Sequence, residues 1–392
     1  MLFDNTQKAY HLKSDKQLHK AYYLFQLISN QTLVILGSWF AKLALKLKLP
    51  IAPLFKATVF SQFCAGLNKE ESLSLVKKLK SYKIQSYLHF AAEESKTEQG
   101  MDLSLENTLE TLSFSKETSS LPFSVFKATA FGPISLFEKK SAKRAFTTVE
   151  KETWDRVLKR IYKCCDTAKK LNINLLIDAE ESWFQDAIDE IAEDLMEKYN
   201  KKTPLIYTTL QMYRKDRLDY LKKLQDKATK KGFKIGIKLV RGAYIEKENS
   251  RAIQSGVSSP ICDSKQLTDI NFNTGLDFIL GHLEESSLFL GSHNESSVQR
   301  VIDWMTENKI EKDHPHIWFS QLLGMADHIS FNLAFEGYRV VKYLPYGPVE
   351  EVIPYLIRRA EENTSVSGQT PRELSLIKKE LKRRKTKTSR SE

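Results

Sequence analysis

Two adjacent arginines near the carboxyl end of the chain are the residues whose types and spacing point most directly to chemistry. In the string YLIRRAEEN, Tyr355, Arg358, Arg359 and Glu362 recur at helical spacing, so a helix would place them on one face. Guanidinium groups make bidentate contacts with carboxylates, so this face could bind an acidic group of a substrate. Taken alone, the pair also fits a solvated surface, the usual place for two neighbouring arginines.

A second group of polar residues stands at the ends of eight short apolar runs. The runs are rich in β-branched and aromatic residues, as buried parallel strands should be, and cover 84–92, 123–131, 174–180, 204–211, 233–240, 287–293, 316–322 and 339–346. The polar residues at their ends are Glu93, Lys127, Asp178, Gln211, Lys238, Arg241, His293, Asn294, Gln321 and Tyr343. A buried polar group costs free energy unless it is paired, so packing alone does not explain so many at one end of a barrel.

Helical patterns separate these runs and predict how the strands are arranged. The segment 216–232 ends on Gly232, a common helix stop. The segment 182–199 places apolar residues on one helical face: Phe184, Ala187, Ile188, Ile191 and Leu195. Alternating strands and helices predict an α/β fold with a parallel sheet, and eight repeats favour a (β/α)8 TIM-type barrel. A doubly wound open sheet is the alternative, but no GxGxxG follows a strand. Active sites of such barrels lie at the carboxyl ends of the strands.

The segments outside the eight repeats also carry helical patterns, at 22–28, 40–47, 71–82 and 371–384. We therefore expect an N-terminal helical segment at 1–80, the barrel at 81–365 and a basic C-terminal tail at 366–392. The hydrophobic fraction of 41% and the charged fraction of 28% are ordinary for a globular protein. The four cysteines show no metal-ligand spacing, so we expect reduced thiols and no metal site.

Charge and hydropathy limit the possible partners. The most apolar stretch, 32–55, is interrupted by Lys42, Lys46 and Lys48 before about 20 apolar residues accumulate, so it should not span a membrane. It could be a buried helix or a helix lying on a bilayer, and the pattern alone favours the buried one. A net charge of +11 fits nucleic acid or anionic lipid. No nucleic-acid motif accompanies the terminal charge run, which reads as a solvated tail, so we expect no nucleic-acid partner.

Four strings resemble the proline dehydrogenase family, in that family's order. They are IDAEES, KLVRGAY, GSHN, and YLPYG followed by YLIRRAEEN, and the resemblance runs from about residue 60 to about residue 363. It implies a distorted (β/α)8 barrel that binds FAD without a covalent bond. It also implies oxidation of L-proline to Δ1-pyrroline-5-carboxylate, with a hydride passing from proline C5 to flavin N5.

The resemblance also implies roles at the substrate. The substrate carboxylate would be bound by Lys127, Arg358 and Arg359. Asp178 would lie near the lysine and the flavin. Tyr343 would pack against the proline ring, and a tyrosine there favours proline over hydroxyproline. These five residues form the expected catalytic set. Glu93 falls where the family has a gating glutamate, although the string LHFAAEE places His89 where the family usually has aspartate, and we expect His89 to be structural.

The residues implied for the flavin come from the ends of the third to seventh strands and from the arginine helix. They are Asp178, Gln211, Lys238, Val240, Gly242, Ala243, Tyr244, Ser292, His293, Asn294, Gln321, Leu323 and Glu362. Small residues such as Gly242 would let the backbone approach the cofactor. Many bacterial members have arginine at the position of Lys238 and lysine at the position of Arg241. Because both side chains are cations, the exchange would keep a positive charge near the isoalloxazine.

Monofunctional members of the family pass electrons to a membrane quinone. The resemblance therefore implies a cytoplasmic enzyme, held on the inner face of the cytoplasmic membrane by residues 32–55 or by the basic tail on anionic lipid. We expect a separate pyrroline-5-carboxylate dehydrogenase to act on the product, because the chain ends soon after the barrel. Two alternatives are a dehydrogenase for hydroxyproline or another cyclic imino acid, and a non-catalytic relative that acts as a binding protein.

Overall fold

The computed structural model describes residues 2–47, 49–91, 97–365 and 369–388, and within these it leaves the side chains of 42, 45, 361–365, 369 and 388 undescribed. The predicted gating residue Glu93 therefore lies outside the described residues. The chain divides into two compact units, which we describe separately. Unit 1 contains Met1–Glu93, His293–Gln299 and Phe319–Glu392, and unit 2 contains Glu94–Ser292 and Arg300–Trp318.

The structure has a strand in each of the eight predicted runs. The strands are β1 (Ile84–Phe90), β2 (Phe123–Lys127), β3 (Asn174–Asp178), β4 (Ile206–Gln211), β5 (Ile235–Val240), β6 (Ser286–Gly291), β7 (Ile317–Leu322) and β8 (Val340–Tyr346). Their order in the sheet is β1-β8-β7-β6-β5-β4-β3-β2. From β2 to β8 each strand adjoins the next strand in the chain, and β1 pairs with β8 in parallel. A doubly wound sheet would instead reverse its order at a switch point, so the fold is a (β/α)8 TIM-type barrel.

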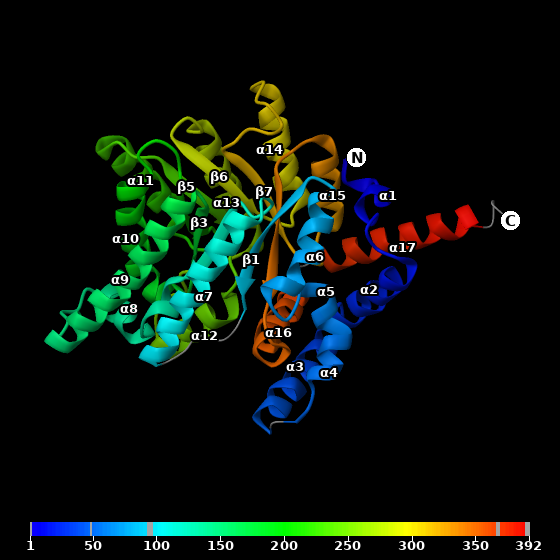
Figure 1. Cartoon of the computed structure of the whole chain (residues 1–392), viewed down its shortest axis with the longest axis horizontal. Coiled ribbons are helices and arrows are strands. Elements are labelled where there is room, and N and C mark those ends of the chain that lie inside the picture. The colour runs from blue at the N-terminus through cyan, green and yellow to red at the C-terminus, as the bar shows by residue number, and fades with distance from the viewer. Residues whose placement is uncertain (1, 48, 92–96, 366–368, 389–392) are drawn as a thin grey trace. The chain divides into compact units, whose positions relative to one another are not determined.

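Helices of unit 2 follow its strands and are drawn in cyan to yellow-green in Figure 1. They are α7 (Glu98–Glu117), α8 (Ile134–Ser141), α9 (Thr148–Leu171), α10 (Ser182–Tyr199), α11 (Arg217–Lys231), α12 (Ile245–Ser255) and α13 (Lys265–Gly281). The apolar face predicted for 182–199 is buried, and Gly232 ends α11 with a left-handed φ of 64°. The run 123–131 was predicted too long, because Ala128–Phe131 forms the 3-10 turn η3.

Unit 1 joins the two ends of the chain. It contains α1 (Thr6–Ala9), α2 (Asp15–Ile28), α3 (Gln31–Lys46), α4 (Ala52–Phe55), the π turn η2 (Lys56–Phe60), α5 (Ser61–Phe63), α6 (Lys69–Lys80), α15 (Asp327–Glu336), α16 (Val349–Ser365) and α17 (Gln369–Thr388). The helix α14 (Glu295–Glu307) begins in unit 1 and ends in unit 2. Figure 1 shows α17 in red beside α2 in blue, and the two helices pack together. Leu376 and Ile377 of α17 are buried in one core cluster with Phe25 and Leu356. The charge run predicted as a solvated tail is therefore solvated on one helical face only.

The helix α3 also departs from the sequence expectation. Its buried residues are small or modest in size, namely Val34, Ser38, Ala41 and Ala44, whereas Trp39 and Phe40 are exposed. The sequence pattern favoured a buried helix at 32–55. This expectation was wrong for the large apolar side chains of α3, which are exposed. In the described part of the chain, no single helix is long and apolar enough to cross a membrane. The helix α2 and the segment Gln31–Ala41 reach that length and apolar character only as a pair, and the two are bent by 94°.

Candidate active site

Two lysine–carboxylate pairs stand at the carboxyl ends of strands in unit 2. Lys238 on β5 is nearly buried, and its Nζ donates to Asp178 Oδ1 at 2.6 Å. Lys127 and Asp178 are register partners at the ends of β2 and β3, so the two residues are neighbours, as the sequence predicts. Lys127 Nζ is 3.8 Å from Glu180 Oε2. The strand ends of this unit therefore hold two cations, each beside a carboxylate.

Glu180 was not singled out from the sequence, although it belongs to the string IDAEES just beyond β3. Its side chain is buried and accepts hydrogen bonds from the Thr129 main-chain N–H at 3.2 Å and hydroxyl at 2.6 Å. Gln211 Nε2 donates to the main-chain oxygen of Glu180 at 2.7 Å, and Gln211 Oε1 accepts from the Ala243 N–H at 3.2 Å. Gln211 therefore ties the loop after β3 to the loop after β5.

The string KLVRGAY forms the end of β5 and the loop that follows it. Arg241 donates to Asp269 at 2.7 Å and to Ser292 Oγ at 3.3 Å, and burial lowers the pKa of its guanidinium. Gly242 has a φ of +137°, and a Cβ there would lie 2.6 Å from the Tyr213 ring. Close packing on Tyr213 therefore requires glycine independently of any cofactor. Of the other predicted residues here, Val240 ends β5, while Ser292 and the Tyr244 side chain are buried.

In unit 1, Tyr343 lies in a row of aromatic rings. Its hydroxyl is 2.5 Å from His89 Nδ1 on β1, and its ring centroid is 5.2 Å from that of Tyr87. The Tyr355 ring of α16 lies 6.2 Å from Tyr343. His89, predicted to be structural, therefore fixes the hydroxyl of the residue expected to face the substrate ring.

The arginine pair continues this row. α16 buries Val352 and Leu356 in the core of unit 1 and leaves Arg358 and Arg359 half-buried at its edge. The Arg359 guanidinium carbon lies 5.4 Å from the centroid of the Tyr355 ring. The helix predicted for this segment is confirmed, which places Tyr355 and the arginines on neighbouring positions of one face. Glu362 lies on the same helix, but its side chain is outside the described residues.

His293 is a half-buried residue of unit 1 that is held in its neutral form. Burial, together with the positive charges of Lys342 and Arg359, lowers its pKa to about 3. Its Nε2 is 3.1 Å from the Leu322 N–H, which donates to it, so the ring proton of the neutral form belongs on Nδ1. The ring therefore does not carry a charge near neutral pH.

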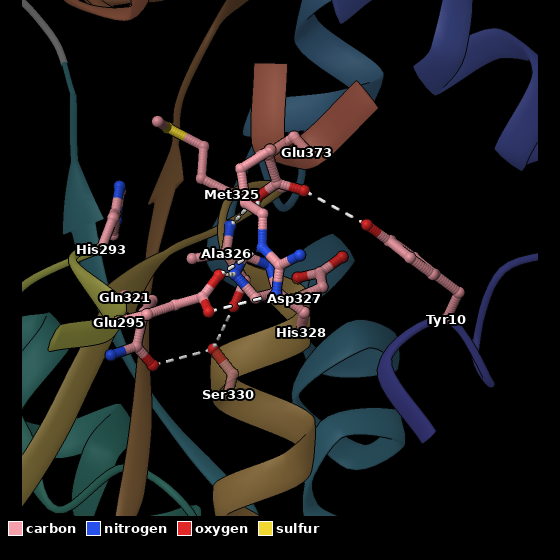
Figure 2. Close-up of polar contacts among 12 residues, drawn as sticks. Tyr10, His293, Glu295, Gln321, Met325, Ala326, Asp327, His328, Ser330 and Glu373 are labelled. Carbon is pink, nitrogen blue, oxygen red and sulfur yellow. Dashed lines mark hydrogen bonds and ion pairs between the residues drawn. The ribbon is translucent and has the colours of Figure 1, made fainter. Parts of the chain in front are cut away.

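The other predicted flavin residues of unit 1 have contacts of their own, some of them drawn in Figure 2. Gln321 on β7 is buried, and its Oε1 accepts from the Ser330 hydroxyl at 2.8 Å. Asn294 Oδ1 accepts from the Ser297 N–H at 3.0 Å in the first turn of α14. The Leu323 N–H donates to the main-chain oxygen of Tyr343 at 3.0 Å. These contacts fix the loops that carry the predicted residues.

Figure 2 also shows a buried polar cluster that sequence reasoning missed. His328 lies 3.0 Å from Glu295 and 3.7 Å from Glu373 of α17, and burial raises the pKa of Glu373. Lys342, fully buried on β8 beside Tyr343, donates to Asp327 at 2.7 Å. Burial acts against ionisation of Asp327, but Lys342 and Lys13 together outweigh burial and keep the pKa of Asp327 below its usual value. The sequence pattern of a strand does not show which residue pairs with a buried lysine. These pairings are therefore visible only in the structure.

The fold and these residues define a class of protein: a (β/α)8-barrel enzyme with cations, aromatic rings and a neutral histidine at strand ends. The sequence profile described as "Proline dehydrogenase" matches residues 72–372. The chain therefore belongs to the proline dehydrogenase family, whose members are oxidoreductases.

Curated relatives include proteins that carry the name of this family and one that does not. "Carbapenem antibiotics biosynthesis protein CarD" of Pectobacterium carotovorum is 34% identical over 83% of this chain and 84% of its own length. "Proline dehydrogenase 1, mitochondrial" of Dictyostelium discoideum is 32% identical over 97% of this chain and 74% of its own length. The human protein of the same name is 39% identical, over 61% of this chain and 40% of its own length.

Solved structures agree on the fold. A proline utilization A (PutA) structure from Bdellovibrio bacteriovorus has a TM-score of 0.73 and 20% identity, covering 92% of this chain. This chain spans 38% of that protein. At this identity the likeness concerns the fold alone.

Proposed function

We propose that this protein oxidises L-proline to Δ1-pyrroline-5-carboxylate with FAD as its cofactor. The observation that carries the proposal is the continuous row in unit 1 from Arg359 through Tyr355 and Tyr343 to His89. Proline is a small ring with an attached carboxylate, so it needs a cation for one end and an apolar wall for the other. The row offers both within the reach of one small molecule.

The chain's own residues bind and orient the substrate in this proposal. Arg358 and Arg359 bind the carboxylate in this proposal, and membership of the family implies the same role for Lys127. The Tyr343 ring lies against the ring carbons, and its hydroxyl is kept in place by His89. Fixing the carboxylate and the ring together leaves one orientation for the carbon that loses hydrogen.

The residues proposed to hold FAD are compatible with an anionic, partly apolar cofactor. Lys238 keeps a nearly buried ammonium at a strand end, and His293 stays neutral. Gln211 and Gly242 fix the loop after β5, and Asn294, Gln321 and Leu323 stand on loops tied down by hydrogen bonds. FAD, when bound, supplies the acceptor for the two electrons removed from the substrate. The Lys238 ammonium would stabilise negative charge beside it.

We further propose that the electrons pass to a membrane quinone, and that the protein works at the inner face of the cytoplasmic membrane. The product would then go to a separate pyrroline-5-carboxylate dehydrogenase. Membership of the family supports the quinone acceptor and the separate second dehydrogenase, and the membrane location follows from the quinone.

The test is to incubate the purified chain with FAD, L-proline and a soluble quinone analogue, and to measure the product by mass spectrometry. The proposal predicts a product two hydrogen atoms lighter than proline, together with reduced quinone. A parallel reaction with 4-hydroxyproline should be slower. Faster turnover of hydroxyproline would show that hydroxyproline, and not proline, is the preferred substrate. No turnover of either compound would refute the proposal.

A further inference from the structure

The helix α3 has its side chains arranged opposite to those of an ordinary surface helix. Small residues at positions 34, 38, 41 and 44 face the interior of unit 1. The opposite face consists of large apolar residues, of which Trp39 is 57% and Phe40 is 61% exposed. Amphipathic helices in water turn their large apolar residues inward, so this face is adapted to a surrounding that is not water.

The apolar surface extends beyond α3 into the segments on both sides of it. Of twenty large apolar side chains exposed in the described part of the chain, eleven lie between Tyr23 and Leu54. Tyr23 and Leu27 come from the end of α2, and Leu49 and Leu54 follow α3. We call these eleven residues the apolar surface; they are Tyr23, Leu27, Leu33, Ile35, Leu36, Trp39, Phe40, Leu43, Leu47, Leu49 and Leu54.

The charged residues of the segment that carries the apolar surface have one sign. Residues 16–69 contain seven lysines and no aspartate or glutamate, although the whole chain has 49 acidic residues. Lys20, Lys46 and Lys56 are among the exposed lysines of this segment. A protein partner is usually met by charges of both signs at the rim of an interface. An apolar segment whose own charged residues are all cations instead complements anionic lipid headgroups above a hydrocarbon layer.

The segment is suited to lying in a bilayer interface rather than crossing the bilayer. The two helices that are long and apolar enough to cross a bilayer only as a pair are bent by 94° relative to each other. The helix α2 also buries Leu18, Phe25 and Ile28 in the core of unit 1. Pulling α2 into lipid would expose the core of the unit. Trp39 and Tyr23 are residue types that prefer the headgroup level of a bilayer.

We propose that α3 and its flanking segments dock this protein on an anionic membrane. The side chains of Leu36, Trp39 and Phe40 enter the acyl boundary, while Lys46 and Lys56 stay among the headgroups. The inference deepens the proposed function, because it names the surface on which the quinone would be met. Docking itself requires neither proline nor FAD, so it is tested separately from catalysis.

The test is co-sedimentation of the full chain with vesicles of phosphatidylcholine, alone or with phosphatidylglycerol. We expect binding to the anionic vesicles that weakens as salt is raised, because salt screens the lysines. The combined variant Leu36→Gln, Trp39→Gln and Phe40→Gln should bind at least about tenfold more weakly, since each change removes an inserted apolar group. The matched control Ile253→Gln with Val257→Gln changes two exposed apolar residues of unit 2 and should leave binding unchanged.

Two further readouts keep the test decisive. The combined variant should retain proline oxidation with a soluble acceptor, which separates lost docking from lost folding or a wrong substrate. The charge variant Lys46→Glu with Lys56→Glu should lose the preference for anionic over neutral vesicles. Absence of binding at low salt would overturn the proposal. So would concentration-dependent self-association that the combined variant abolishes, because the apolar surface would then bind a second copy of the chain.

Discussion

Arg358 and Arg359 stand at the cationic end of the aromatic row, where the account places the substrate carboxylate. A lysine keeps the charge but loses the planar fork that holds both carboxylate oxygens. We expect Arg358→Lys or Arg359→Lys to lower kcat/KM for proline roughly 10- to 100-fold, the effect of about 1.5–3 kcal/mol for a charged hydrogen bond. Steady-state kinetics measure this. Arg300→Lys, at a surface pair with Asp277, is the control and should change nothing. Unchanged kinetics in both test variants would exclude the pair from the site.

Tyr343 sets the other end of the substrate in this account. Tyr343→Ser removes the ring and opens space beside His89, so the ratio of hydroxyproline to proline turnover should rise at least several-fold. Tyr343→Phe keeps the ring and removes only the hydroxyl, so it should retain the preference for proline. If the serine variant kept the wild-type ratio, Tyr343 would not face the substrate ring.

His293 gives the protein a predictable response to acid. Its pKa is about 3 in the folded chain and about 6.5 when unfolded, so the unfolded chain binds the extra proton between these values. The stability contributed by neutral His293 is complete above about pH 6.5 and is lost as the pH falls toward 3. We expect the thermal midpoint of the wild type to drop more than that of His293→Gln between pH 7 and 5. Parallel curves for the two proteins would show that His293 is already charged or exposed.

At the level of elements, α17 shows where the sequence was informative and where it was not. Its helical pattern was predicted, but the burial of Leu376 and Ile377 against α2 was not, because the partner lies more than 300 residues away in the chain. Leu376→Ala or Ile377→Ala should each reduce the free energy of unfolding by about 2–5 kcal/mol. Denaturant unfolding measures this, with Lys378→Ala, on the exposed face, as the control. A loss below about 0.5 kcal/mol in both test variants would mean that α17 does not belong to the folded core.

The strands were predictable for a simple physical reason. Strands buried on both faces read as short apolar runs, so their positions follow from composition, with errors of a few residues at the ends, as at η3. The polar partners were not predictable in this way. Glu180 beside Lys127, Asp327 beside Lys342 and His89 beside Tyr343 are pairs between separate elements. A single sequence gives the positions of such residues but not their distances.

At the level of the whole molecule, the strand order explains how polar residues far apart in the sequence come to stand at one edge of the sheet. From β2 to β8 each strand adjoins the next strand in the chain, and β1 adjoins β8, so the carboxyl ends of the strands lie at the same edge. The strand ends of each unit carry different residues. Unit 1 carries the arginines and the aromatic row, and unit 2 carries the two lysine–carboxylate pairs. We propose that the row of unit 1 binds proline and that bound FAD accepts its electrons.

The most direct measurement of that claim is the visible absorption spectrum of the full chain loaded with FAD, before and after L-proline is added without oxygen. We expect the spectrum of bound flavin to bleach when proline is added. The variant Arg359→Lys should need a higher proline concentration for the same bleaching. A bound flavin that stays oxidised with proline, yet is reduced by dithionite, would contradict the account.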